Sequence, residues 1–341
     1  MPDPDVQSVA AAVGLAEGPS GVEAVLAALA RLEPVSVRRL AQAADLPVPI
    51  VAAICGELRG LGHVSEARPV QLTLEGRRRF ATGPLLRVTC PACGGRGIEL
   101  SGAVARLRRG LAAVADTSPE PLVELDQCHC TPKTKLRRVL ALHAAGAIEG
   151  RRILLLGDDD LISVTLLRFV RQLGGRIEEL VVVDVDQRLL GFIEEQLDGA
   201  PFPYRCVEAD LRRESVDGRF DTVVTDPPYT AAGARLFLTR AAEALAGPGA
   251  QVFLSFGSRR PGAQFVVQRS IVELGLEIRS LTRDFNEYVG AGVLGGTSHL
   301  YHLAVPASTE SDDGFYTAAR RRTGATPSTS HRRETRSAAT P

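Results

Sequence analysis

The chain lacks the features that would place it in a membrane or on nucleic acid. Its apolar runs stay short of the ~18 residues that a membrane span needs, and the N-terminal stretch MPDPDVQSVAAAVG has no charged start followed by an apolar core. An excess of one charge is also missing, since 40 basic side chains are balanced by 40 acidic ones. A net charge near zero gives no overall attraction to nucleic acid or anionic lipid. We therefore expect a cytoplasmic protein without a membrane partner.

Lysine is scarce as well. Lys133 and Lys135 are its only two positions, and the accompanying richness in Ala, Gly and Arg indicates a compositional bias rather than a function. The 341 residues, 45% of them apolar, are enough for a full hydrophobic core and a second module.

Residues 1–89 predict a winged-helix-like N-terminal domain. From Val22 onward three helices show apolar residues at three-to-four spacing, and VQLTLEGRRRFA adds a strand, a turn and the start of a helix. Such modules often bind DNA, yet this region balances 9 arginines against 9 acidic residues, and its third helix, VPIVAAICGELRGL, is mostly apolar. Reading DNA requires cations for phosphates and polar groups for base edges. A packing or dimerisation role is favoured, and nucleic acid is not the expected partner.

Residues 90–130 form a connector with two cysteine pairs, Cys90 with Cys93 and Cys128 with Cys130. Two thiolates separated by two residues in a Gly-rich turn can share one Zn²⁺, and two such pairs would complete a tetrahedral site. The second pair has a single intervening residue and follows after 34 residues, a longer gap than a zinc ribbon usually has. Zinc is possible here but not favoured, and reduced thiols without metal are the alternative.

Strands and helices alternate regularly through residues 131–306. Short β-branched runs such as RILLLG, LVVVDVD and FDTVVTDPP are separated by helical patterns such as RLLGFIEEQL, and EIRSLTRDF with TSHLYHLAV indicates a final strand pair. This alternation predicts a Rossmann-like α/β catalytic domain with a doubly wound sheet, whose ligands bind at the carboxyl ends of the strands. Residues 307–341 lack periodicity and are expected to be a disordered tail.

Seven aspartates follow four of the predicted strands, at the edge where ligands bind. Any single one is equally well explained as a helix cap or a turn former, but seven at one edge favour a binding role. Asp184 is placed to hold a ribose, because a carboxylate accepts from both hydroxyls, and Asp210 would then lie near a base. The seven are Asp158, Asp159, Asp160, Asp184, Asp186, Asp210 and Asp226.

The motif DPPY, from Asp226 to Tyr229, is the most informative of these segments. Its prolines fix a rigid turn with free carbonyl oxygens, and the tyrosine ring covers the site. Carbonyl and carboxylate oxygens that converge on one point suit a nitrogen that loses a proton as it attacks an electrophile. The motif after a fourth strand is similar to the signature of S-adenosylmethionine-dependent amino-methyltransferases.

The run GDDD, from Gly157 to Asp160, favours a different transfer chemistry. S-adenosylmethionine carries a carboxylate on its methionyl end, and each contact of that group with an aspartate at ~4 Å costs on the order of 1 to 4 kcal/mol, depending on solvation. Decarboxylated S-adenosylmethionine keeps the ammonium and the sulfonium and avoids this repulsion. A polyamine would also be attracted by the same acids.

With these segments the sequence resembles the N4-bis(aminopropyl)spermidine synthase family, the branched-chain polyamine synthases. The likeness is carried by CPACGGRG, LDQ with TPKT, RRVLALHAAGAIEGRRILLLGDDDLISV, VVVDVDQRLL, FDTVVTDPPYT and DFNEYVG. The resemblance implies aminopropyl transfer from decarboxylated S-adenosylmethionine to the secondary amine of spermidine or a related polyamine, by a homodimer. It also implies that Asp159 and Glu287 flank the reacting amine.

The expected site follows from these segments and the resemblance. Asp159 is the candidate base, and Asp226 and Glu287 are the other candidate catalytic residues. A second possibility is an amino-methyltransferase of the DPPY type, and a third is a non-catalytic winged-helix sensor of polyamine or nucleoside. The residues expected to hold the donor are Gly157, Asp158, Asp160, Asp184, Asp210, Pro227 and Tyr229.

Overall fold

The structure is a computed structural model, which describes residues 3–81, 90, 92–257, 262–290 and 296–307. The expected disorder of residues 307–341 concerns a segment that, apart from Ala307, lies outside the described residues.

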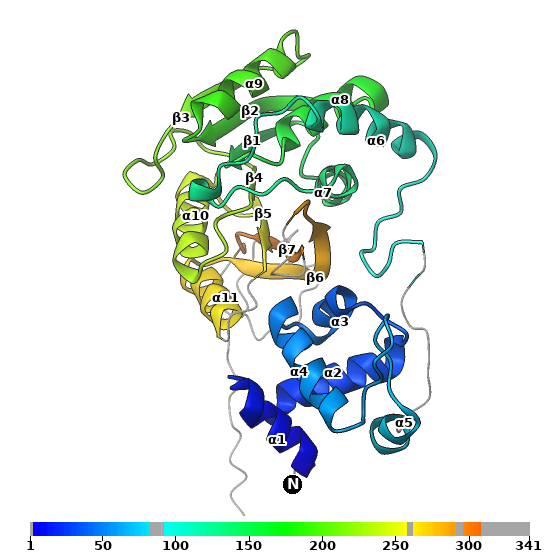
Figure 1. The fold of residues 1–341 in the computed structure, drawn as a ribbon. Coiled ribbons are helices and arrows are strands. Elements are labelled where there is room, and N and C mark those ends of the chain that lie inside the picture. The colour runs from blue at the N-terminus through cyan, green and yellow to red at the C-terminus, as the bar shows by residue number, and fades with distance from the viewer. Residues whose placement is uncertain (1–2, 82–89, 91, 258–261, 291–295, 308–341) are drawn as a thin grey trace, which may run out of the picture. The chain divides into compact units, whose positions relative to one another are not determined.

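Five helices make up the described part of the N-terminal region (Figure 1). Apolar residues recur every three or four positions in these helices and so lie on one face. In the second helix, for example, Val22, Val25 and Leu29 are buried. Isolated antiparallel bridges join Val35 to Val70 and Val64 to Leu72. The winged-helix class stays a prediction. The helices are α1 (Pro4–Val13), α2 (Pro19–Leu32), α3 (Val37–Ala44), α4 (Val48–Gly60) and α5 (Leu74–Phe80).

A seven-stranded sheet forms the centre of the remaining chain, in the order β3-β2-β1-β4-β5-β7-β6. The first five strands in this order are parallel, and β7 runs antiparallel to both of its neighbours. The predicted α/β class, with strands alternating with helices and a final strand pair, is confirmed. The strands are β1 (Arg151–Leu156), β2 (Ile177–Asp184), β3 (Tyr204–Glu208), β4 (Thr222–Thr225), β5 (Gln251–Phe256), β6 (Glu277–Glu287) and β7 (Thr297–Ala304).

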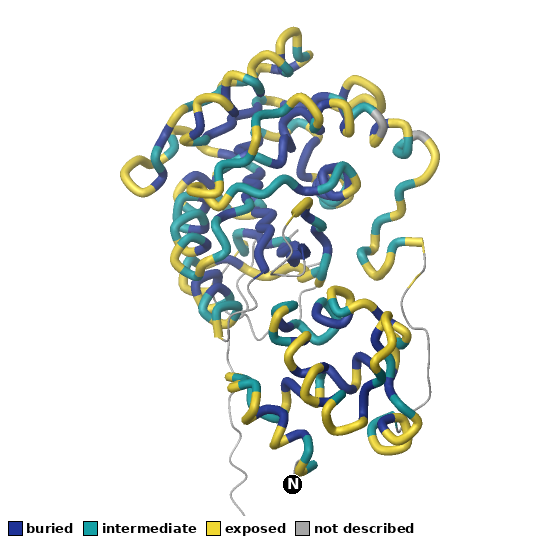
Figure 2. Tube along the Cα trace, in the orientation of Figure 1, coloured by how far each residue is buried: buried dark blue, intermediate teal, exposed yellow. Residues whose placement is uncertain are grey.

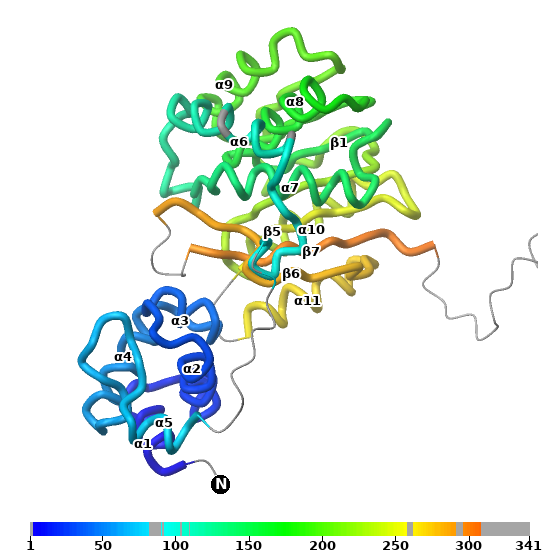
Figure 3. Tube along the Cα trace, turned by 90° about the vertical axis from the view of Figure 1, so that its right-hand side faces the viewer, coloured from blue at the N-terminus to red at the C-terminus, as the bar shows by residue number. Residues whose placement is uncertain are grey.

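Helices cover both faces of this sheet. One apolar cluster joins α6, α7, α8 and α9 to Ile153 and Leu155 of β1, and a second joins α10 and α11 to Leu154 and Leu156. Figure 3 shows α7 and α11 on opposite sides of β6 and β7, and Figure 2 shows the buried strands between exposed outer helix surfaces. The helices are α6 (Gly102–Ala115), the 3₁₀ turn η1 (Val123–Leu125), α7 (Pro132–Ala144), α8 (Ile162–Leu173), α9 (Gln187–Leu197), α10 (Ala231–Ala244) and α11 (Ala263–Glu273).

The register of the parallel strands brings three loops together. Leu156, the last residue of β1, pairs with Val183 of β2 on one side and with Thr225 of β4 on the other. The chain leaves β1 between two strands whose crossover helices lie on opposite faces, which is the switch point where this class of sheet binds ligands. The loops after β1, β2 and β4 therefore surround one place.

Within the part of the chain that the structure describes, no single helix has the length and apolar character to cross a membrane. The bent pair α3 and α4 passes that test only when its two helices are taken together.

Candidate active site

The three aspartates after β1 lie in three different environments. Gly157 turns the chain with a left-handed φ of 71°. Asp158 is buried and caps α8, because its carboxylate accepts from the backbone N–H groups of Ile162 (2.6 Å) and Ser163 (3.1 Å) and from the Ser163 hydroxyl (2.5 Å). For Asp158, therefore, the structure shows the capping role that is the ordinary one for an aspartate after a strand.

Asp160 is paired with Arg138, which reaches it from α7. The Arg138 Nη1 lies 2.5 Å from Asp160 Oδ2, and both side chains are almost fully buried. Burial alone would raise the pKa of Asp160, but the Arg138 guanidinium reverses this and holds it below the ordinary value. Asp160 is thus a buried carboxylate with a fixed counter-ion.

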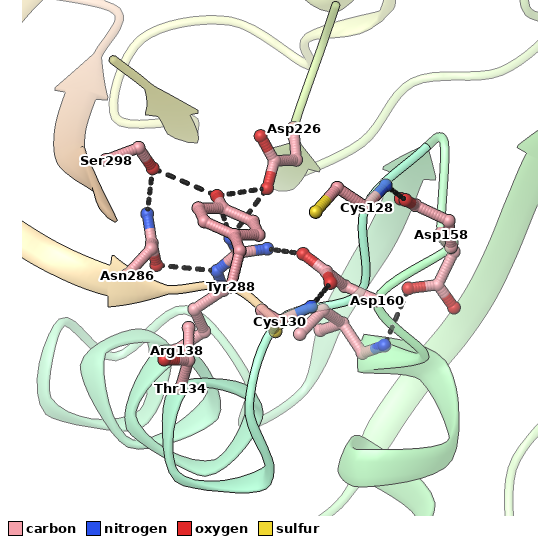
Figure 4. Close-up of polar contacts among 12 residues, drawn as sticks. Cys128, Cys130, Thr134, Arg138, Asp158, Asp160, Asp226, Asn286, Tyr288 and Ser298 are labelled. Carbon is pink, nitrogen blue, oxygen red and sulfur yellow. Dashed lines mark hydrogen bonds and ion pairs between the residues drawn. The ribbon is translucent and has the colours of Figure 1, made fainter. Parts of the chain in front are cut away.

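Arg138 is the centre of a larger network (Figure 4). Its Nη2 donates to Asp226 Oδ2 (2.7 Å) and to the Tyr288 hydroxyl (2.8 Å), and its Nε donates to Asn286 Oδ1 (2.8 Å). A guanidinium offers five donors in a planar fork and no acceptor, so it can bind several oxygens at once. One side chain of α7 therefore fixes the acids that follow β1 and β4 to the end of β6.

The second cysteine pair lies in the segment that holds the acid loop. The backbone N–H of Cys128 donates to Asp159 Oδ2 (3.0 Å), and that of Cys130 donates to Asp160 Oδ1 (2.5 Å). The segment is itself held by the end of β6, since Thr131 N donates to the Glu287 carbonyl at 2.8 Å. Here the two cysteines contribute backbone donors to the aspartates.

A cavity of about 100 Å³ opens beside this network. Of the three aspartates after β1, Asp159 lines it, and Asp226 lines it from β4. Among the described residues, the Oδ1 atoms of both side chains have no hydrogen-bond partner. The lining residues are Asp126, Cys128, Asp159, Asp226, Pro227, Tyr229, Tyr288, Gly296 and Thr297.

Asp159 and Asp226, two of the three carboxylates that line the cavity, have raised pKa values. Burial, together with the charges of Asp160 and Asp226, raises the pKa of Asp159 well above its ordinary value. Burial also raises the pKa of Asp226 to about 7, against the opposing effect of Arg138. Asp226 can therefore exchange a proton near neutral pH, as a proton acceptor in catalysis must.

Asp226, Pro227 and Tyr229 of the DPPY turn line the cavity, and the role of Pro227 and Tyr229 in holding the donor stays a prediction. The Tyr229 backbone N–H donates to Asp126 Oδ2 (2.9 Å), which ties the turn to the segment before Cys128. The Tyr229 ring packs edge-on against Phe256 and Tyr288, with centroids 5.7 and 5.9 Å apart.

The acids after β2 and β3 are held by local contacts. Asp184 accepts from the backbone N–H groups of Asp158 (3.2 Å) and Asp186 (2.9 Å), so it stands directly beside the β1 loop. Asp186 caps α9. Asp210 forms a two-pronged ion pair with Arg212, whose hydrogen bonds lower the pKa of Asp210 to about 2.

Glu287 is not among the residues that line this cavity. Its carboxylate pairs with Arg96 Nη2 (2.8 Å) and lies 3.6 Å from Arg137 Nη1. Successive side chains of a strand point to opposite faces, and its neighbours Asn286 and Tyr288 are the ones that meet Arg138. The catalytic role expected for Glu287 stays a prediction.

The first cysteine pair forms a tight turn. Gly94 N donates to the Cys90 carbonyl (2.8 Å) and Arg96 N to that of Cys93 (3.2 Å). Hydrogen bonds from backbone N–H groups, first that of Gly97, lower the pKa of the Cys93 thiol. Among the described residues no group of three or more His, Cys, Asp or Glu side chains is arranged to hold a metal ion.

Sequence reasoning missed Arg138, Tyr288 and Asp126. Two features of the sequence could have indicated Arg138 and Tyr288. Arg138 lies between the apolar residues Leu136 and Val139 of its helix pattern, where a buried arginine needs anionic partners, and Tyr288 occurs in the same NEYV segment as Glu287. The partners of each come from distant segments.

The strand order defines a Rossmann-like α/β fold, with an acid-lined cavity at the switch point of its sheet. The profile of the branched-chain polyamine synthase A C-terminal domain matches residues 107–338. The chain therefore belongs to the branched-chain polyamine synthase family, and the predicted aminopropyltransferase class is confirmed.

Individual relatives agree with this assignment. The chain is 34% identical over 269 residues to an N(4)-bis(aminopropyl)spermidine synthase of Thermococcus kodakarensis, covering 75% of this chain and 74% of that one. It is 32% identical over 307 residues to an uncharacterized protein of Methanocaldococcus jannaschii, covering 87% and 77%. The crystal structure of the Thermus thermophilus branched-chain polyamine synthase, in complex with N4-aminopropylspermidine and 5′-methylthioadenosine, superposes with a TM-score of 0.71 at 26% identity, covering 88% of this chain and 92% of that one.

Proposed function

We propose that this enzyme moves aminopropyl groups from decarboxylated S-adenosylmethionine to a secondary amine of spermidine or a related polyamine, giving branched-chain polyamines. One observation carries the proposal: two carboxylates with raised pKa values, Asp159 and Asp226, line one cavity at the switch point of the sheet. The Thermus relative, whose crystal structure contains an aminopropylated spermidine and 5′-methylthioadenosine, supports it.

The chemistry requires a base and a counter-ion at the same nitrogen. A polyamine nitrogen with a pKa near the lysine-like ~10.4 is protonated at neutral pH and must lose that proton before it attacks. Its lone pair then forms a C–N bond to the carbon beside the sulfonium, the C–S bond breaks, and 5′-methylthioadenosine leaves. We assign proton removal to Asp159, while Asp226 holds the charge of the ammonium.

Two of the remaining acids, Asp184 and Asp210, are our candidates for binding the donor. Asp184, beside the β1 loop, is our candidate for the ribose hydroxyls, and Gly157 allows the backbone to turn beneath the nucleoside. We place the adenine on the side of Asp210. Asp158 and Asp160 act indirectly, because the first caps α8 and the second is neutralised by Arg138.

The arrangement of domains belongs to the same proposal. We infer a winged-helix-like domain over residues 1–89 that serves packing or dimerisation, a connector over 90–130, a catalytic domain over 131–306 and a homodimer in the cytoplasm. Analytical ultracentrifugation of the whole chain tests the dimer, and a single monomeric species at micromolar concentration would contradict it.

The activity is tested by incubating purified protein with each sulfonium donor and with a series of amines, followed by mass spectrometry of the products. We expect a mass increase of one or two aminopropyl groups on spermidine with decarboxylated S-adenosylmethionine. A methylated product formed from S-adenosylmethionine would instead support the amino-methyltransferase of the DPPY type. Binding of polyamine or nucleoside without any product would support the sensor.

A further inference from the structure

We propose that Tyr288 is a positioning residue of this reaction, whose hydroxyl fixes one oxygen of Asp226 and thereby leaves the other directed at the amine. The inference rests on the proposed function, because it concerns the orientation of one carboxylate of that site.

The Tyr288 hydroxyl stands at the junction of four polar groups. The Tyr229 hydroxyl lies 2.5 Å away, Asp226 Oδ2 2.6 Å, Arg138 Nη2 2.8 Å and Ser298 Oγ 2.9 Å. The residue is buried, with 6% of its surface exposed, and its ring lines the cavity. Such a hydroxyl is fixed from several sides in a medium of low polarity, where each hydrogen bond is strong.

The neighbours of Tyr288 determine where its proton points. A phenol has one proton to donate and two lone pairs that accept. Arg138 can only donate, and the Tyr229 hydroxyl donates as well, so these two use both lone pairs of the Tyr288 oxygen. Two acceptors then remain for the Tyr288 proton. Ser298 Oγ, at 2.9 Å, already accepts from Asn286 Nδ2, whereas Asp226 Oδ2, at 2.6 Å, is a carboxylate oxygen and the stronger acceptor, so the proton is directed to Asp226.

Asp226 Oδ2 is in this way held by two donors, one from Arg138 and one from Tyr288. Arg138 is shared with Asp160, so a single N–H from it would leave the Asp226 carboxylate free to rotate. The second donor fixes the plane of the carboxylate. Both donors are on Oδ2, so Oδ1 is the oxygen of Asp226 that is left for a ligand in the cavity that Asp159 also lines.

A hydroxyl that donates to a carboxylate also favours its ionised form. Removing the donor should therefore make Asp226 retain its proton to a higher pH. A purely structural tyrosine would not change the protonation of Asp226, so the dependence of rate on pH separates the two roles.

The test is Tyr288→Phe, which removes the hydroxyl and keeps the ring. At saturating donor and acceptor we expect turnover to fall by ~10-fold or more, with little change in KM for the donor. We also expect the acid limb of the rate profile to move to higher pH. Tyr204→Phe, at the start of β3 and away from the cavity, is the matched control and should leave both unchanged.

A double-mutant comparison with Asp226→Asn is the second part of this test. If Tyr288 acts through Asp226, adding Tyr288→Phe to Asp226→Asn should cost little further rate, because the two residues work as one unit. Independent, additive losses would overturn the proposal, and so would an acid limb that Tyr288→Phe leaves in place.

Circular dichroism checks the fold of each variant. If Tyr288→Phe fails to fold, Tyr229→Phe serves as the test instead. This substitution removes a hydroxyl that donates to Tyr288, so it should move the acid limb of the rate profile to higher pH by a smaller amount. An unmoved limb in Tyr229→Phe would then reject the inference. Absence of aminopropylated product from the unaltered enzyme would instead reject the proposed function itself.

Discussion

At the residue scale, three consecutive aspartates have three different partners. Asp158 binds the first amides of α8, Asp160 binds a buried arginine, and Asp159 lines the cavity. Because two of the charges are satisfied within the protein, the affinity of this loop for a cation depends mainly on the middle residue. Substitutions of Asp158, Asp159 and Asp160 should therefore differ in the property that they change, stability or activity, as well as in the size of the effect.

Asp159→Asn tests the role of the middle residue. If Asp159 removes the amine proton, this isosteric change should lower turnover by ~10² or more at saturating donor and acceptor. The fold should be retained, because an Asn oxygen can still accept from the backbone N–H of Cys128. Steady-state rates and thermal unfolding measure the two effects, and a near-normal rate would move the role to Asp226 or Glu287.

At the element scale, α7 and the segment before it organise the site. The helix supplies Arg138, and the residues that precede it pair with the end of β6 and donate to the acid loop. Segments that are far apart in sequence thus meet at one guanidinium. Removal of one partner from such a buried ion pair leaves an uncompensated charge, which is more costly than the net contribution of the pair.

Asp158→Ala should destabilise the start of α8. Loss of this capping side chain costs about 1 to 2 kcal/mol of unfolding free energy, because the amides of Ile162 and Ser163 would lose their acceptor in a buried place. Urea denaturation of this variant measures the loss. Asp116→Ala, an exposed aspartate after α6, is the control and should change stability little. Equal stability of both variants would contradict the capping role.

The cysteine segments allow a prediction about metal. We expect less than one zinc per purified chain, because the Cys128 thiol donates to the Val289 carbonyl (3.4 Å) and the Cys130 side chain is buried, so neither sulfur is presented as a zinc ligand. Elemental analysis of the protein measures this content. One tightly held Zn²⁺ per chain that is lost in Cys128→Ser would show the prediction to be wrong.

At the scale of the whole molecule, the sheet collects negative charge at one edge. The acids reach that edge from β1, β2 and β4, which the strand register places side by side. A donor with an ammonium and a sulfonium is favoured there over one that also carries a carboxylate, since like charges in a partly buried site repel.

The choice of donor is measurable as a difference in affinity. We expect decarboxylated S-adenosylmethionine to bind at least tenfold more tightly than S-adenosylmethionine, which corresponds to ~1.4 kcal/mol. Isothermal titration calorimetry with each donor gives the two dissociation constants. Equal constants would reject selection by charge, and the same titration in Asp159→Asn should show a reduced preference.

The alternation of strands and helices, the acids at the strand ends and the family could be predicted from the sequence, because apolar periodicity and short motifs are local properties of the chain. It could not assign separate roles to Asp158, Asp159 and Asp160, which are adjacent in sequence and chemically identical. The sequence also could not show that the backbone of Cys128 and Cys130 holds the acid loop, or that Tyr288 contacts Asp226 while its neighbour Glu287 pairs with Arg96. These points follow from the folded chain, because hydrogen bonds, burial and pKa shifts depend on groups from distant segments that the fold brings to one place.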